Sequence, residues 1–311
     1  MRVVFCGTPD IAVPSLESIA AHDAFDVLAV LTQPDRPAGR GRAPRESPVK
    51  EAAKRLGLRV ESPDRVRDVR PWLEELAPDA MVVVAYGHIF RRWLLELPRY
   101  GCVNAHFSLL PRHRGVAPVQ WAILDGDRET GVTTMKMDRG VDTGPTLLEE
   151  RVTIGAEETA GELLARLAPI AGGLLVRTLD GLARGTLEAS PQSEEGATYA
   201  RKLEKEDGRV DWSRPAAEIA RQVRGLSPWP GAFTTFRGAG LKLHEVRVAP
   251  ASGSSEPGRL VHDAGRILAE TGSGRLELLC IQAEGKARLP AEAWWRGARP
   301  EARERLGREV L

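Results

Sequence analysis

Residues 101–115, GCVNAHFSLLPRHRG, combine an apolar run with side chains that can do chemistry. Side chains alternate between the two faces of a β-strand, so Asn104, His106 and Ser108 would share one face. Histidine is the side chain that most readily gains or loses a proton near neutral pH. Three polar side chains at the end of a sheet strand either meet solvent or build a site. An isolated Asn-x-His pair is more often satisfied by its own neighbours.

A second segment supplies a carboxylate. Residues 131–145, GVTTMKMDRGVDTGP, predict a strand followed by a loop that carries Asp138 and Asp142 among glycines. A carboxylate on such a loop can approach a histidine closely and set its orientation or charge. Taken alone, an aspartate in this position is more often a plain turn residue.

Strand and helix patterns alternate around these segments and predict an open α/β sheet. Helical periodicity follows the first strand, restarts after the Ser47-Pro48 pair and extends over residues 159–182. The run AMVVVA at 80–85 is typical of a strand that is buried on both faces. The predicted strands are 2–6, 25–31, 80–85, 103–107, 132–137 and 146–152. We expect a Rossmann-like, mostly parallel sheet with ligands at the carboxyl ends of its strands.

The pattern changes in the last two-fifths of the chain. A stretch with few apolar anchors and many charges is typical of a linker. Beyond it, short alternating segments separated by Gly, Pro and Ser predict a small antiparallel β-barrel, OB-like in type. Its predicted strands are 232–236, 241–248, 258–262, 266–270 and 276–281. The expected organisation is a first domain over 1–186, a linker over 187–205 and a barrel domain over 206–311.

Composition excludes several classes of function. The 311 residues include 44 basic and 43 acidic ones, a net charge of +1, so any nucleic-acid contact would need a local patch. The three cysteines lie far apart without a CxxC pair, which argues against a zinc site or a disulfide framework. No apolar run is long enough to cross a bilayer, and the N-terminus lacks a secretory pattern. We therefore expect a cytoplasmic protein with no metal and no membrane contact.

A long central segment resembles the folate-dependent formyltransferases. Residues 104–144, NAHFSLLPRHRGVAPVQWAILDGDRETGVTTMKMDRGVDTG, are similar to the central signature of that family. The likeness extends along essentially the whole chain, and its C-terminal segments are those of the branch that acts on aminoacyl-tRNA. The other matching segments are GTPDIAVPSL, LTQPDRPAGRGR, SPVKEAAKRLGL, MVVVAYG, WSRPAAEIARQVRGLSPWPGAF and QAEGKARL.

The resemblance implies a formyl transfer from 10-formyltetrahydrofolate, the co-substrate, to the α-amino group of methionyl initiator tRNA. The product would be the N-formylmethionyl-tRNA of translation initiation. As the amine attacks the formyl carbon, a tetrahedral oxyanion develops. Asn104 and His106 match the family's donors to that oxygen. Asp142 matches the aspartate that orients the histidine and helps to move a proton from the amine to the departing folate nitrogen.

The resemblance also implies binding residues. Folate contacts are expected from Tyr86, Gly87, Ser108, Leu109, Leu110 and Pro111. Contacts to tRNA are expected from Arg36, Arg40, Arg42 and Arg45. These arginines lie in a Gly/Pro-rich stretch, 32–50, which by itself fits a solvated loop, although arginine suits phosphates and stacked bases. The barrel is expected to support the tRNA, and the enzyme to be a monomer.

Two residues depart from the family's pattern. Phe107 stands where the family usually has a small residue, and we expect only local repacking there because its strand face points away from His106. His113 stands where an aromatic residue is usual, in the turn after Pro111, and can alter contacts to folate or tRNA. His88 is not counted among the catalytic residues.

Three other functions each fit part of the sequence. A small-molecule formyltransferase, acting on glycinamide ribonucleotide or an amino sugar, would use the same Asn, His and Asp, but the arginine-rich stretch and the C-terminal region argue against it. A nicotinamide-dependent oxidoreductase would need GxGxxG where this chain has Gly7-Thr8-Pro9-Asp10. A non-catalytic RNA-binding protein would not need Asn104, His106 and Asp142 together.

Overall fold

The computed structural model describes residues 1–38, 43–250, 256–301 and 304–307, with side chains for all of these except 36–38 and 43–44. Contacts group the chain into two units. The first consists of Met1–Pro118, Glu129–Thr153 and Leu164–Ala200, and the second of Val119–Arg128, Ile154–Leu163 and Arg201–Leu311. The domain boundaries expected above, at 186 and 205, stay a prediction.

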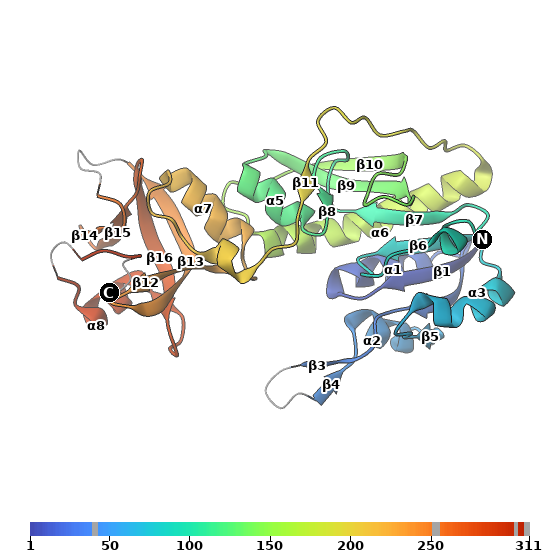
Figure 1. Cartoon of the computed structure of the whole chain (residues 1–311), viewed down its shortest axis with the longest axis horizontal. Helices are drawn as coiled ribbons and strands as arrows, with labels where there is room; N and C mark the ends of the chain where they lie inside the picture. Colours follow the sequence, from blue (N-terminus) through green and yellow to red (C-terminus); the bar gives the residue numbers. More distant parts are fainter. Residues whose placement is uncertain (39–42, 251–255, 302–303, 308–311) are drawn as a thin grey trace. The chain divides into compact units, whose positions relative to one another are not determined.

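A seven-stranded sheet forms the centre of the first unit (Figure 1). Its strands, in the order β10-β9-β7-β6-β1-β2-β5, are β10 (Thr146–Thr153), β9 (Glu129–Lys136), β7 (Cys102–His106), β6 (Ala80–Val84), β1 (Arg2–Gly7), β2 (Asp26–Leu31) and β5 (Val60–Glu61). The five strands from β7 to β5 are parallel, and β9 is antiparallel to both of its neighbours. The predicted Rossmann-like sheet is confirmed.

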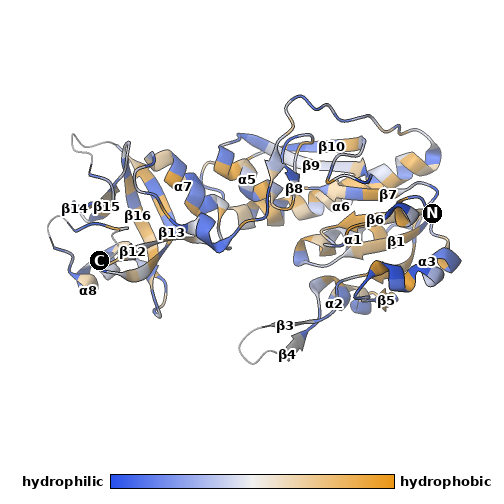
Figure 2. Cartoon of the chain, in the orientation of Figure 1, coloured by the Kyte–Doolittle hydropathy of each residue, from blue (hydrophilic) through white to orange (hydrophobic). Residues whose placement is uncertain are grey.

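The centre of this sheet is apolar on both faces, as the AMVVVA run indicates. Every residue of β6 is buried, and so are the five residues of β1 from Val3 onward. Figure 2 shows hydrophobic colours along both strands. The chain leaves β1 toward β2 on one side and later returns to place β6 on the other, with Gly7 opposite Val84. The strand order therefore reverses beside β1, where the carboxyl ends of the strands leave room for a ligand.

Helices connect the strands of the first unit. They are α1 (Val13–Ala20), α2 (Pro48–Arg55), α3 (Arg70–Leu76), α4 (Arg92–Leu95) and the long α6 (Ala160–Arg184), which begins among residues grouped with the second unit. The predicted start of α2 is observed, because the Ser47 side chain accepts a hydrogen bond from the Lys50 N–H (3.1 Å) and Pro48 occupies the first turn. None of the helices within the described ranges is long and apolar enough to cross a membrane.

Two short strand pairs were not expected from the sequence. β3 (Arg36–Ala38) and β4 (Ala43–Arg45) form an antiparallel pair in the stretch predicted to be a loop. Pro37 lies opposite Pro44 there, and a two-stranded ribbon tolerates proline because each strand has a free edge. β8 (Arg114–Gly115) pairs with β11 (Tyr199–Ala200), which attaches part of the predicted linker to the first unit.

The second unit contains an antiparallel sheet in the order β12-β13-β16-β15-β14, with β17 beside β16. The strands are β12 (Ala232–Phe236), β13 (Ala239–Ala249), β14 (Leu260–Asp263), β15 (Arg266–Glu270), β16 (Arg275–Ala283) and β17 (Leu289–Pro290), and the helices are α5 (Pro118–Asp125), α7 (Ala216–Gly225) and α8 (Ala291–Ala298). Trp212, Ile219 and Trp294 belong to its buried core. The predicted antiparallel domain is confirmed, whereas closure into a barrel stays a prediction.

Adjacent glycines in α6 test how this helix packs. A Cβ on Gly172 would lie 2.5 Å from the Ser18 hydroxyl and 2.9 Å from the Pro14 carbonyl oxygen, whereas a Cβ on Gly173 would have nothing within 4 Å. We expect Gly172→Ala to destabilise the protein by about 1–3 kcal/mol, because α1 must move. Gly173→Ala, the matched control, should stabilise it by about 0.5–1 kcal/mol. Urea midpoints that shift in the same direction for both variants would contradict this packing.

Candidate active site

Two of the predicted residues lie on β7, at the carboxyl end of the central sheet. Asn104 is half-buried and His106 is buried. β7 is hydrogen-bonded on both sides, with Asn104 opposite Val83 of β6 and Met135 of β9. The backbone is thereby fixed, and strand alternation directs both side chains to the same face.

Asp142 joins them from the loop after β9. One carboxylate oxygen, Oδ1, accepts a hydrogen bond from the Asn104 amide (3.4 Å). The other, Oδ2, accepts the backbone N–H of Gly115 (2.9 Å) and lies 3.6 Å from Nδ1 of His106. The structure thus brings together all three residues proposed for catalysis, although 38 residues separate Asn104 from Asp142.

The loop around Asp142 needs its glycines. The backbone passes so close to itself that a Cβ on Gly144 would lie 1.8 Å from the Lys136 carbonyl oxygen. A Cβ on Gly140 would lie 2.0 Å from the side-chain hydroxyl of Thr143. Asp142 itself has a left-handed backbone, with φ of 54°. Such a conformation costs a non-glycine residue free energy, so the surrounding contacts must hold it.

A backbone carbonyl determines which nitrogen of His106 carries the proton. Nε2 lies 2.8 Å from the carbonyl oxygen of His113, which can only accept. The neutral ring is therefore protonated at Nε2, and its Nδ1 lone pair faces the carboxylate of Asp142. A second proton, on Nδ1, would point toward that carboxylate. The pair can take up a proton and release it, which is general acid–base chemistry.

The turn after β7 is held together by side-chain hydroxyls. The fully buried Ser108 donates to the Arg112 carbonyl oxygen (2.6 Å), and Thr133 donates to the Ser108 carbonyl oxygen (2.7 Å). The Ser108 hydroxyl therefore stabilises the turn and is already engaged in a hydrogen bond. Leu110 is buried, whereas Leu109 and Pro111 are half-buried and keep some accessible surface.

The two departures from the family's pattern are both buried. Phe107 directly follows β7, and His113 lies in the turn with a positive φ of 56°. The geometry of the candidate site depends on the backbone of residue 113, since its carbonyl oxygen accepts a hydrogen bond from His106 and its N–H donates to the Thr198 hydroxyl (2.8 Å).

The strand end at residues 86–87 is built mainly from backbone. The Tyr86 side chain is buried in the core, and its carbonyl oxygen accepts hydrogen bonds from the Thr8 hydroxyl and the Gln33 amide, both 3.1 Å long. Gly87 is exposed with φ of 81°. A ligand at this edge would therefore meet Gly87 and main-chain atoms before the Tyr86 ring.

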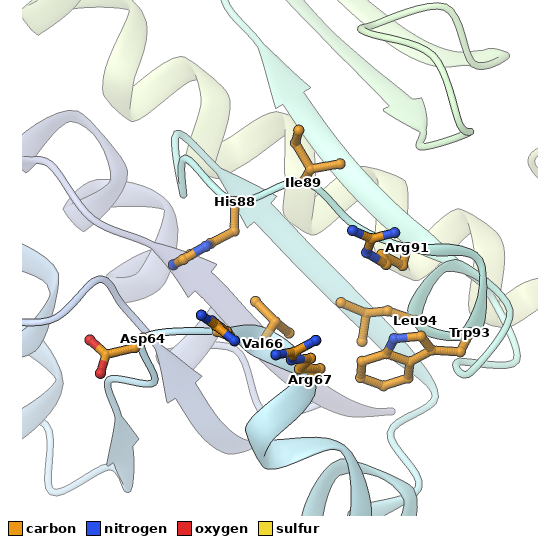
Figure 3. A pocket seen from close by; sticks show the side chains of 9 residues that line it. Asp64, Val66, Arg67, His88, Ile89, Arg91, Trp93 and Leu94 are labelled. Atoms are coloured by element: carbon orange, nitrogen blue, oxygen red, sulfur yellow. The ribbon is translucent and has the colours of Figure 1, made fainter.

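A pocket of about 350 Å³ lies beside this strand end (Figure 3). It is lined by Asp64, Arg65, Val66, Arg67, His88, Ile89, Arg91, Trp93 and Leu94. Three arginines and one acid make the lining positive overall, which suits an anionic group. Sequence reasoning did not find this pocket, because its arginines come from two separate segments, and only the RVR triplet at 65–67 could have drawn attention to it.

The arginines proposed to contact tRNA are only partly described. Arg45, at the end of β4, is exposed, and Arg36 lies opposite it in β3. Arg40 and Arg42 lie outside the described residues.

Buried thiols are poor candidates for nucleophiles. Burial raises the pKa of Cys6 well above its usual range and that of Cys102 to about 12. Both thiols are protonated at neutral pH and therefore weakly nucleophilic. In the parts of the chain that the structure describes, no three His, Cys, Asp or Glu side chains gather closely enough to hold a metal ion.

Sequence comparisons match the chain along nearly its whole length. A family profile described as "Formyl transferase" matches residues 1–179, and one described as "Formyl transferase, C-terminal domain" matches 202–299. Proteins called methionyl-tRNA formyltransferase from Solibacter usitatus and Koribacter versatilis are each 48% identical to this chain, with 99% of both chains covered. One from Paracoccus denitrificans is 49% identical, covering 96% of this chain and 97% of its own.

Solved structures share the fold at low sequence identity. WlaRD, a sugar 3N-formyl transferase crystallised with dTDP and 5-N-formyl-THF, has a TM-score of 0.68 and 16% identity, covering 92% of this chain and 99% of its own. HypX from Aquifex aeolicus, in complex with tetrahydrofolic acid, has a TM-score of 0.63 and 16% identity, covering 98% of this chain and 48% of its own.

The His113 carbonyl gives a spectroscopic prediction. Long-range ¹H–¹⁵N spectra of the labelled protein should show the neutral His106 ring protonated at Nε2, because the carbonyl can only accept a hydrogen bond. The exposed His262 serves as the control and should show a mixture of tautomers. A neutral His106 ring protonated at Nδ1 would contradict the geometry of the site.

Proposed function

The chain belongs to the formyl transferase family, and we propose that it transfers the formyl group of 10-formyltetrahydrofolate to the α-amino group of methionyl initiator tRNA. One observation carries this proposal: Asn104, His106 and Asp142 meet at the carboxyl end of β7, in a chain that is 48% identical over its full length to relatives named for this activity. The product is the formylated initiator tRNA used to start translation.

The first chemical step is attack of the acceptor amine on the formyl carbon. Its carbonyl oxygen becomes an oxyanion, which aligned hydrogen-bond donors stabilise. Asn104 gives one amide hydrogen to Asp142 and has a second for that oxygen. His106, once protonated at Nδ1 toward Asp142, would add a positive charge beside that oxygen. No side-chain nucleophile is needed, because the amine itself forms the new bond.

Proton transfer completes the reaction. The attacking amine must lose a proton, and the folate nitrogen must gain one as its bond to the formyl carbon breaks. Asp142 and Nδ1 of His106, 3.6 Å apart, form a pair that can accept the first proton and return it to the leaving nitrogen. The His113 carbonyl and the Gly115 N–H keep the ring and the carboxylate oriented during this exchange.

We place the folate along the edge formed by Gly87 and the turn at 108–111. Leu109 and Pro111 offer half-buried apolar surface, Ser108 and Leu110 shape the turn, and the backbone around Tyr86 closes the edge. The positive pocket beside it suits the carboxylates of the glutamate tail that folates carry.

We further propose that four arginines of the 32–50 stretch, Arg36, Arg40, Arg42 and Arg45, contact the acceptor end of the tRNA. The antiparallel sheet of the second unit would support the rest of the tRNA. We propose that the enzyme acts as a monomer. The cytoplasm, where translation begins, is the proposed location.

A direct comparison of acceptors tests the function. Purified protein should transfer formyl from 10-formyltetrahydrofolate to methionyl initiator tRNA and leave glycinamide ribonucleotide and amino-sugar nucleotides unmodified. Labelled formyl followed by acid precipitation of the tRNA measures the reaction. Activity with one of the small acceptors and none with the tRNA would overturn the proposed acceptor.

Alanine variants at Asn104 and His106 test the proposed chemistry. Loss of one oxyanion donor should lower kcat on the order of 10²–10³-fold while tRNA and folate binding are kept. His262→Ala, at an exposed position of β14 in the second unit, is the control for removal of an imidazole. Near-normal kcat in the Asn104→Ala and His106→Ala variants would refute these roles.

A further inference from the structure

The loop that carries Asp142 is attached to a glutamine fifty residues further along the chain. The Gln192 amide nitrogen donates to the carbonyl oxygens of Asp142 (2.9 Å) and Gly144 (2.7 Å). An amide nitrogen has two hydrogens, so both are used on the same loop. Gln192 therefore holds the backbone on both sides of residue 143.

The other end of Gln192 is fixed by a buried arginine. Its amide oxygen accepts a hydrogen bond from Nε of Arg114 (3.0 Å). The Arg114 side chain is 1% exposed and pairs at 3.2 Å with Glu194, whose side chain is 79% exposed. A buried guanidinium that loses its partners is strongly destabilising, so Arg114 has a strong preference for this arrangement. Arg114 thus defines where the Gln192 amide lies.

These contacts close a ring around the catalytic carboxylate. Gly115 directly follows Arg114 and donates its N–H to Oδ2 of Asp142 (2.9 Å). Gly115 holds the carboxylate of Asp142, and Gln192 holds the main-chain carbonyl of the same residue. Both are attached to Arg114, Gly115 as its neighbour in the chain and Gln192 through a hydrogen bond. The left-handed φ of 54° at Asp142 is a strained conformation that such a double attachment can maintain.

We propose that Gln192 and Arg114 are positioning residues for Asp142, which hold its carboxylate beside Nδ1 of His106 throughout the proton transfer. This inference rests on the proposed function. Neither residue has to touch the substrate, the folate or the reacting atoms. Without Gln192, the 142–144 loop can relax from its strained conformation, and the carboxylate then moves away from the imidazole.

Two substitutions of Gln192 separate its roles. Gln192→Met keeps a similar volume and removes all three hydrogen bonds. Gln192→Glu keeps an acceptor for Arg114 but places a carboxylate oxygen against the carbonyl oxygens of residues 142 and 144. Glu195→Met, in the same segment with an exposed side chain, is the matched control.

Both Gln192 variants should lower kcat by about 10–100-fold, because small displacements of a catalytic group are costly. KM for both substrates should stay within about twofold, and the kcat–pH profile should shift, because the proton-transfer pair is altered. A merely structural glutamine would leave the pH profile of the folded fraction unchanged. Glu195→Met should match the unmodified protein.

The imidazole spectrum of His106 gives a readout that needs no activity. Its Nδ1 resonance should move in Gln192→Met and Gln192→Glu and stay in place in Glu195→Met. An unchanged resonance with an unchanged pH profile in both Gln192 variants, each shown to be folded by circular dichroism, would overturn the positioning role. If the unmodified protein transfers no formyl group, the proposed function is wrong. A resonance that moves in the Gln192 variants would still support the contacts that hold Asp142 beside His106.

Discussion

The carboxylate of Asp142 collects donors from separate parts of the chain, and much of the first unit serves to keep those donors in place. Each of its oxygens has a fixed neighbour, the Asn104 amide for one and the Gly115 N–H for the other. Parallel strands buried on both faces give β7 a rigid position. The loop that carries the carboxylate is irregular, and it depends on glycines and on a strained φ to reach its partners. The rigid strands and the constrained loop together bring the polar side chains of Asn104, His106 and Asp142 close to one another.

The parts of this arrangement that depend on local chemistry could be predicted from the sequence. The alternation of residues 103–107 places Asn104 and His106 on one face, and glycines on both sides of Asp142 indicate a close approach of the backbone. The parallel sheet can be predicted because apolar runs alternate with segments of helical periodicity, and both patterns reflect which residues are buried.

Contacts made by polar residues over long distances could not be predicted in this way. Residues 190–200 are polar and read as a linker, because hydropathy reports burial in an apolar core and carries no information about hydrogen bonds to a distant loop. Arg114 is fully buried although charged residues rarely are, so no pattern indicated its role. The β3–β4 pair could not be predicted for a different reason: it contains Pro37 and Pro44, and proline normally argues against a strand.

Charge in this protein acts locally. A net charge of +1 gives no general attraction for anions, yet three arginines line the pocket beside β6, and Arg36 and Arg45 lie opposite each other in the β3–β4 pair. Separate positive regions attract anionic groups to particular places, whereas a uniformly basic surface would attract them everywhere.

The hydrogen bond between His106 and a main-chain carbonyl determines which substitutions the site can accept at position 113. Every amino acid has a backbone carbonyl oxygen, so no substitution at position 113 removes the group that fixes the tautomer of His106. Residue 113 is a histidine in this chain, and its carbonyl oxygen lies 2.8 Å from Nε2 of His106. At position 115 only proline would remove the N–H that holds Asp142, and any side chain there would put a Cβ 2.6 Å from the Ala200 carbonyl oxygen. A substitution of the side chain at position 113 leaves this hydrogen bond possible, whereas position 115 requires glycine for reasons of space.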